Sequence, residues 1–232
     1  MQNDKTKDLL HFHFLVFLWG FTSILGAIIN LTAIQIVWHR MLIAYVIVFF
    51  YLYFKGLKKF KIPKKFIFQI IIAGILISVH WAAFFYAIKI SGVSLTLSIL
   101  ASGAFLTSII EPIFFKRKTS IKELLFGSIT LIGLLIIFRA EFDQYIGMLV
   151  AFLATLLSVI FTLINSKLVK NNLSPITITF YELFIGWLFI SFYIYFDFES
   201  INSLFQFTLS DFLLLFILGS ACTAYAHLVS VK

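Results

Sequence analysis

Charged side chains inside the long apolar stretches of this sequence are the first candidates for chemistry. Arg40, Glu111 and Glu182 lie in such stretches. A charge at the centre of a bilayer costs about 2.5–3.5 kcal/mol on insertion scales, so each must lie near an interface, pair with another group or face water. Arg40 could hold an anionic group of a bound solute, pair with a carboxylate, or extend to the outer lipid headgroups.

The two carboxylates suggest different roles. Glu182 lies deep in its stretch, where a carboxyl group could take up and release a proton. Lys167 and Lys170 could instead reach it as counter-ions. Glu111 comes shortly before the basic residues 116–118, so we expect a structural ion pair there.

Uncharged polar and aromatic side chains add candidates for the wall of a cavity. His80 could exchange hydrogen bonds with a solute, or make one ordinary bond between helices. Ser98 and Ser102 are spaced to share one face of a helix, where small side chains either allow close packing or line a cavity. Asn165 lies far enough into its stretch to need a partner. The full set of candidate cavity residues is Trp19, Arg40, His80, Trp81, Ser98, Ser102, Asn165, Tyr181 and Glu182.

Motifs for catalysis, metal binding or nucleotide binding are absent from the sequence. It contains no phosphate loop, no nucleophile elbow and no metal-ligand spacing. His11 and His13 point to different faces of a helix, and Cys222 is the only cysteine, which excludes an internal disulfide. We therefore expect no catalytic residue, no metal site and no cofactor, and we predict that the protein is not an enzyme.

Membrane-spanning helices must position these side chains. Of the 232 residues, 62% are hydrophobic and 12% are charged, whereas a soluble domain has roughly 25% charged residues. In lipid only helices and closed barrels satisfy the backbone. The apolar runs are continuous and of helical length, unlike the alternating stretches of barrel strands. The sequence thus predicts an all-α polytopic membrane protein with spans near 10–29, 34–54, 66–89, 92–115, 122–138, 145–166, 176–196 and 211–230.

Basic residues are concentrated in alternate connections between these spans. The N-terminal segment and the second, fourth and sixth connections hold 14 lysines and arginines, whereas the other face has Lys89, Arg139 and mostly acidic loops. Loops rich in Lys and Arg stay in the cytoplasm, so we predict a cytoplasmic N-terminus in the inner (plasma) membrane. Topology and anionic headgroups explain the net charge of +8, and no nucleic-acid partner is expected.

Two parts of the sequence align without gaps at an offset of 142 residues. The motif NLTAI at 30–34 aligns with NLSPI at 172–176. The other aligned pairs are Trp19 with Phe161, Trp38 with Phe180, Arg40 with Glu182 and Ala44 with Gly186.

This offset spans five helices, an odd number, so the second copy would enter the membrane from the opposite side. We predict inverted repeats of five helices, one at 1–140 and one at 145–232 that stops after its third helix. Eight helices of an expected ten would then be present; an eight-helix protein without such a truncation is the alternative.

A series of features from the second to the fifth span has a characteristic order. The features are Arg40 in the second span, Ala87 and Lys89 at the end of the third, Pro112 before a basic loop, and Glu123, Gly127 and Gly133 at the fifth. In this order and spacing the chain resembles the EamA domain of the drug/metabolite transporter superfamily, most strongly over residues 80–138. The resemblance implies ten helices in two EamA repeats, and transport without ATP hydrolysis.

The expected function is secondary transport of small metabolites or drug-like solutes, by alternating access to a midplane cavity between the repeats. The expected partners are a small-molecule solute and the lipid bilayer, with proton coupling and a homodimer left open. Two alternatives remain at this point. A membrane-embedded lipid-modifying enzyme should show a cluster of catalytic polar residues at one interface, and a non-transporting subunit or receptor would need no inverted repeat.

Overall fold

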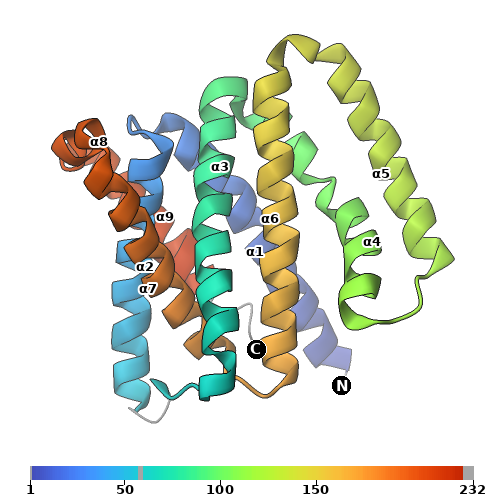
Figure 1. Cartoon of the computed structure of the whole chain (residues 1–232), viewed down its shortest axis with the longest axis horizontal. Helices are drawn as coiled ribbons and strands as arrows, with labels where there is room; N and C mark the ends of the chain where they lie inside the picture. The colour runs from blue at the N-terminus through green and yellow to red at the C-terminus, as the bar shows by residue number, and fades with distance from the viewer. Residues whose placement is uncertain (1, 57–59, 227–232) are drawn as a thin grey trace.

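The computed structural model describes residues 2–56 and 60–226, and within them every regular element is a helix (Figure 1). The elements are α1 (Gln2–Ile28), α2 (Ala33–Lys55), η2 (Lys64–Phe66), α3 (Ile67–Leu100), α4 (Gly103–Phe115), α5 (Ile121–Ala140), η3 (Phe142–Gln144), α6 (Tyr145–Lys170), α7 (Pro175–Phe196), α8 (Phe198–Ser203), α9 (Leu209–Gly219) and the π-helical η4 (Ser220–Tyr225). Five helical stretches are long and apolar enough to cross a membrane, and three shorter apolar helices accompany them in the described part of the chain. The protein is therefore an all-α polytopic membrane protein, as predicted.

The third and fourth predicted spans differ from the prediction in their boundaries. They are joined at Gly92, whose φ of 80° and ψ of 167° interrupt α3 without a loop. The predicted span 92–115 is itself divided, because α3 ends at Leu100 and α4 starts at Gly103. Between them the amide of Ser102 bonds the carbonyl three residues earlier, as in a tighter helical turn. One predicted helix is thus two.

Helices α2, α3, α6 and α7 form a closely packed block. Glycines allow the closest approaches: a Cβ atom added at Gly186 would lie 2.3 Å from Cε of Met41 and 2.8 Å from the carbonyl oxygen of Gly74. Small residues at such crossings let helices in lipid gain van der Waals contact. Large side chains such as Phe85 and Met41 then fill the interior and are fully buried.

Helix α5 lies outside this block and packs mainly against α4 (Figure 1). Gly127 is its one buried residue, held against Phe105 and Ser108 of α4. Gly133 has no such neighbour, because a Cβ atom there would meet nothing within 4 Å. Most of the apolar side chains of α5 are therefore exposed on the outside of the bundle.

The connections rich in basic residues lie at one end of the bundle (Figure 1). Arg117, in the α4–α5 connection, forms ion pairs with Glu111 (3.4 Å) and Glu123 (3.0 Å), which confirms the structural pair expected for Glu111. At the other end, Nζ of Lys89 donates to the carbonyl of Ile29 beyond the last turn of α1 (2.5 Å). Lys58, Lys59 and the end of the predicted span 211–230 lie outside the described residues.

Candidate functional site

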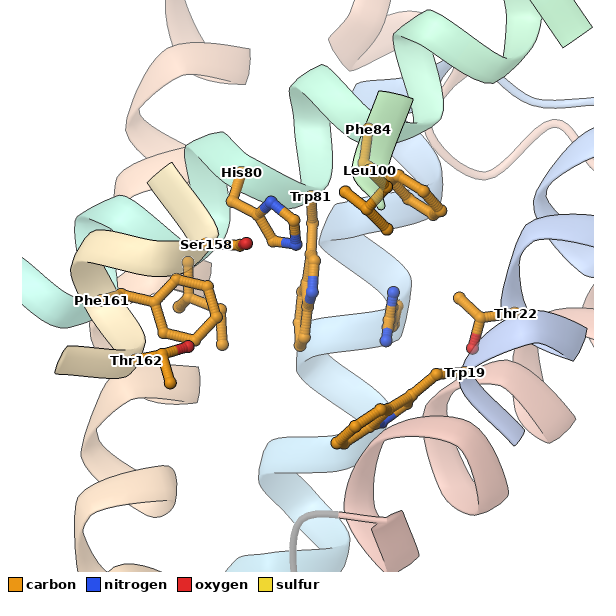
Figure 2. A pocket seen from close by; sticks show the side chains of 11 residues that line it. Trp19, Thr22, His80, Trp81, Phe84, Leu100, Ser158, Phe161 and Thr162 are labelled. Carbon is orange, nitrogen blue, oxygen red and sulfur yellow. The ribbon is translucent and has the colours of Figure 1, made fainter. Parts of the chain in front are cut away.

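A cavity of about 290 Å³ lies among α1, α2, α3 and α6. Its wall consists of Trp19, Thr22, Arg40, Ile77, His80, Trp81, Phe84, Leu100, Ser158, Phe161 and Thr162. Figure 2 shows the ring of Trp81 in the middle of the view, with His80, Ser158, Phe161 and Thr162 on one side of it and Trp19 and Thr22 on the other. Four predicted residues, Trp19, Arg40, His80 and Trp81, are brought together here.

Helical periodicity explains which neighbours join these four. Ile77 and Phe84 are one turn before and after the His80–Trp81 pair, so α3 presents all of them on one side. Thr22 follows Trp19 by one turn of α1 in the same way. The spacing from His80 and Trp81 could thus have identified Ile77 and Phe84 as wall residues from the sequence.

Arg40 is buried, with 3% of its surface exposed, so it does not extend to the outer headgroups. Its guanidinium lies over the ring of Trp81, 3.8 Å from the ring centre, and 5.6 Å from that of Phe85. Its Nε donates a hydrogen bond to Oγ1 of Thr223 (2.6 Å). Thr223 belongs to the π-helical turn η4, a kind of irregularity that often re-aims side chains at functional sites.

His80 forms a bond between two helices and also lines the cavity. Its Nδ1 lies 2.7 Å from the carbonyl oxygen of Ala154 on α6. A carbonyl only accepts, so Nδ1 carries the proton and Nε2 of the neutral ring is an acceptor. One of the two roles left open for His80, a bond between helices, is therefore present.

The hydroxyl groups on the wall had no distinctive signal in the sequence. Thr22 donates to the carbonyl of Leu18, and Ser158 to that of Thr155, as hydroxyls do in many apolar helices. Each hydroxyl keeps lone pairs that a solute could use.

Ser98 and Ser102 do not lie on one continuous helix, since α3 ends at Leu100 and α4 starts at Gly103. Ser98 is exposed and lies beside Ile136 and Gln144, away from the cavity. Ser102 is fully buried, and its Oγ has no hydrogen-bond partner. Neither residue contributes to the cavity wall.

Three further predicted site residues do not line the cavity: Asn165 on α6, and Tyr181 and Glu182 on α7. Nδ2 of Asn165 donates to Oε2 of Glu182 (3.2 Å), so Asn165 has the partner it was expected to need. Oε1 of Glu182 and Oδ1 of Asn165 are buried without a partner. The hydroxyl of Tyr181 donates to the carbonyl of Phe60 (2.7 Å).

The lysines expected as counter-ions of Glu182 lie elsewhere. Nζ of Lys170 lies 3.8 Å from the ring centre of Phe115, and Nζ of Lys167 lies 5.6 Å from that of Phe114. Both lysines therefore pack α6 against the end of α4. Over the described residues, no three His, Cys, Asp or Glu side chains gather as metal ligands.

Comparison with protein families gives one match. The model of the EamA-like transporter family matches residues 9–139, just over half of the chain. This stretch includes most of α1, all of α2, α3 and α4, nearly all of α5, and eight of the eleven residues of the cavity wall. Searches of curated proteins and of solved structures gave no match.

Proposed function

Because this chain belongs to the EamA-like transporter family, we propose that it is a secondary transporter of small metabolites or drug-like solutes. The cavity carries this proposal: it is of the size of small-molecule sites, mostly aromatic and apolar, with a few polar groups that converge on it. Transport by such a protein requires that the cavity open alternately to the two sides of the membrane. A lipid-modifying enzyme would instead need catalytic polar residues gathered at one interface.

We further propose that two inverted repeats, 1–140 and 145–232, build this transporter. Helices α2 and α7 cross in a way that supports it. Tyr45 stacks on Phe180 with ring centres 5.2 Å apart, and Trp38 lies 5.8 Å from Trp187. Adding 142 to Tyr45 gives Trp187, and adding 142 to Trp38 gives Phe180. The two contacts are therefore equivalent under the offset found in the sequence.

Two glycines that are 145 residues apart, Gly74 and Gly219, contact residues that are related by the offset of 142. A Cβ atom at Gly74 would lie 2.9 Å from Cβ of Ile185 and 3.1 Å from the carbonyl oxygen of Glu182. At Gly219 it would lie 2.7 Å from Cβ of Ile43 and 3.2 Å from the carbonyl oxygen of Arg40.

Ile43 and Ile185 are 142 residues apart, as are Arg40 and Glu182. The packing of α3 on α7 thus resembles that of α9 on α2. Trp19 and Phe161, also 142 residues apart, both line the cavity, which is where a site between inverted repeats is expected.

We propose that the N-terminus is cytoplasmic and that the protein lies in the inner (plasma) membrane. The basic connections at one end of the bundle favour this orientation, because Lys and Arg loops are retained in the cytoplasm.

Glu182 is the proposed proton-coupling group. It is 1% exposed, one of its oxygens is bonded to Asn165, and the other has no partner. A proton on that oxygen would remove the uncompensated charge, so protonation and the packing of α7 would depend on each other.

The transport proposal is tested with full-length protein in proteoliposomes, using the solutes whose export or uptake changes when cells express it. Wild type should accumulate such a solute under a proton gradient. Glu182→Gln should lose driven accumulation and keep solute exchange, whereas Glu141→Gln, at an exposed turn, should retain both. Unchanged driven accumulation in Glu182→Gln would remove this residue from coupling. Failure of the wild type to exchange any such solute would refute the transporter.

A further inference from the structure

We propose that the cavity selects small organic monoanions, binding the anionic group at Arg40 and an apolar body along its aromatic wall. This inference rests on the proposed transport function and names the class of solute for the same cavity. Four observations carry it: the charge of Arg40, which has no carboxylate partner among the described residues, the place of its aligned carboxylate Glu182, the size of the cavity and the occupied face of Trp81.

Arg40 is the only side chain of the cavity wall that is always charged. Its Nε is bonded to Thr223, and within the described residues its other four N–H groups have no acceptor and no carboxylate lies within ion-pair distance. A buried charge without a partner is strongly unfavourable. A carboxylate bound from the cavity would offset it through two parallel hydrogen bonds to the guanidinium fork.

Glu182, the aligned counterpart of Arg40, does not provide this counter-charge. Its carboxylate is bonded to Asn165, and it is not part of the cavity wall. The other titratable group on the wall, His80, holds its Nδ1 proton on Ala154 and adds no negative charge. No carboxylate of the described residues forms an ion pair with Arg40, so an anionic solute would supply the negative charge.

The cavity is too large for an inorganic anion alone. A water molecule occupies roughly 30 Å³ in the liquid, so a cavity of about 290 Å³ has room for about ten non-hydrogen atoms. Six of the eleven wall residues are apolar or aromatic, and they would contact the body of the solute: Trp19, Ile77, Trp81, Phe84, Leu100 and Phe161.

The position of Arg40 also argues against a cationic solute. Aromatic walls can bind cations through the faces of their rings. Here one face of Trp81 is already covered by the guanidinium of Arg40 at 3.8 Å. A second cation in the same cavity would be repelled by the first.

Three probes of nearly equal shape test the inference: phenylacetate, phenylethanol and phenylethylamine. Their binding to purified full-length protein is measured by equilibrium dialysis at neutral pH. We expect phenylacetate to bind about 10- to 100-fold more tightly than phenylethanol, the range for a hydrogen bond to a charged group. Phenylethylamine should bind more weakly than the alcohol.

Variants then assign the preference to Arg40. Arg40→Met should bring the affinities for phenylacetate and phenylethanol to within a few-fold of each other, whereas Arg40→Lys keeps the charge and should keep part of the preference. Arg117→Met, which removes an arginine in the α4–α5 connection, should leave the preference unchanged. If Arg40→Met does not fold, the three probes on the wild-type protein still decide the class of solute.

Equal binding of the acid and the alcohol, tighter binding of the amine, or no binding of any of the three would overturn the inference. Binding of chloride by a protein that does not bind phenylacetate would also overturn it. Solute exchange in proteoliposomes separates this from the transport proposal. Selective phenylacetate binding without exchange of any solute supports the anion site and refutes transport. Exchange of solutes without preference for anions supports transport and refutes the anion site.

Discussion

Helices α2 and α5 are both apolar enough to cross a membrane, yet their surroundings differ. In the most apolar part of α2, 56% of the residues are buried inside the protein, whereas in α5 the share is 6%. Hydropathy therefore places both helices in the bilayer and does not tell which is surrounded by protein. Lipid is as apolar as a core, so burial has to be decided by shape and by polar groups.

The polar groups of the two helices show the difference. In α2, Nε1 of Trp38 donates to Ser191 (2.9 Å) and Nε2 of Gln35 donates to Ser203 (2.8 Å), so its side chains bond to distant parts of the chain. In α5, the hydroxyls of Ser128 and Thr130 donate to carbonyls of α5 itself. Long-range bonds accompany α2 in the packed block, and local bonds accompany the exposed α5.

The largest difference in unfolding free energy should come from truncating one large side chain in the packed block and one on α5. Phe85 is fully buried and Phe126 is 71% exposed. Phe85→Ala should lower the free energy of unfolding by about 3 kcal/mol or more, because it leaves a cavity in the packed block. Phe126→Ala should change it little, because lipid replaces the ring. Unfolding by titration with sodium dodecyl sulfate measures both; equal losses would contradict the distinction.

Glycine substitutions give the next largest effect. In Gly186→Leu the new side chain would collide with Met41 and with the backbone at Gly74. We expect a loss of about 1–3 kcal/mol in unfolding free energy, as for other overpacked interiors. Gly133→Leu adds the same atoms where nothing lies within 4 Å and should have no measurable effect on the same titration. A tolerated Gly186→Leu would mean that α2 and α7 can separate.

The smallest effect concerns single polar side chains. Oε1 of Gln35 accepts from the amide of Thr32 in a capping box, and its Nε2 bonds Ser203. Gln35→Ala should destabilise the protein by about 1 kcal/mol, the usual size of a lost cap. Ser128→Ala removes only a bond within α5, so the melting temperature should stay the same. A larger shift for Ser128→Ala would show that α5 has a partner surface.

The spans could be predicted from the sequence because a bilayer imposes their length and their apolar composition. The boundary near Gly92 was predicted, whereas the break after Leu100 was missed, since apolar residues continue on both sides of it. Ser98 and Ser102 were wrongly aligned for this reason. The break depends on local backbone geometry that hydropathy does not contain.

The candidate site was predicted only in part. Trp19, Arg40, His80 and Trp81 could be found because their residue types are unusual in apolar helices. Thr22, Ser158 and Thr162 were missed, because hydroxyls in membrane helices commonly bond the preceding turn and carry no sign of a cavity. The rotation of each helix about its axis decides which face meets the cavity. In lipid, both faces can be equally apolar.

The turn at Gly92 has a consequence for the synthesis of this protein. The third and fourth spans are joined by a single residue with positive φ, so no stretch of polar chain separates them. The two spans must therefore insert into the bilayer together. During biosynthesis the two should leave the insertion machinery as one hairpin, and the ribosome would have to complete the fourth span before the third could settle in the bilayer.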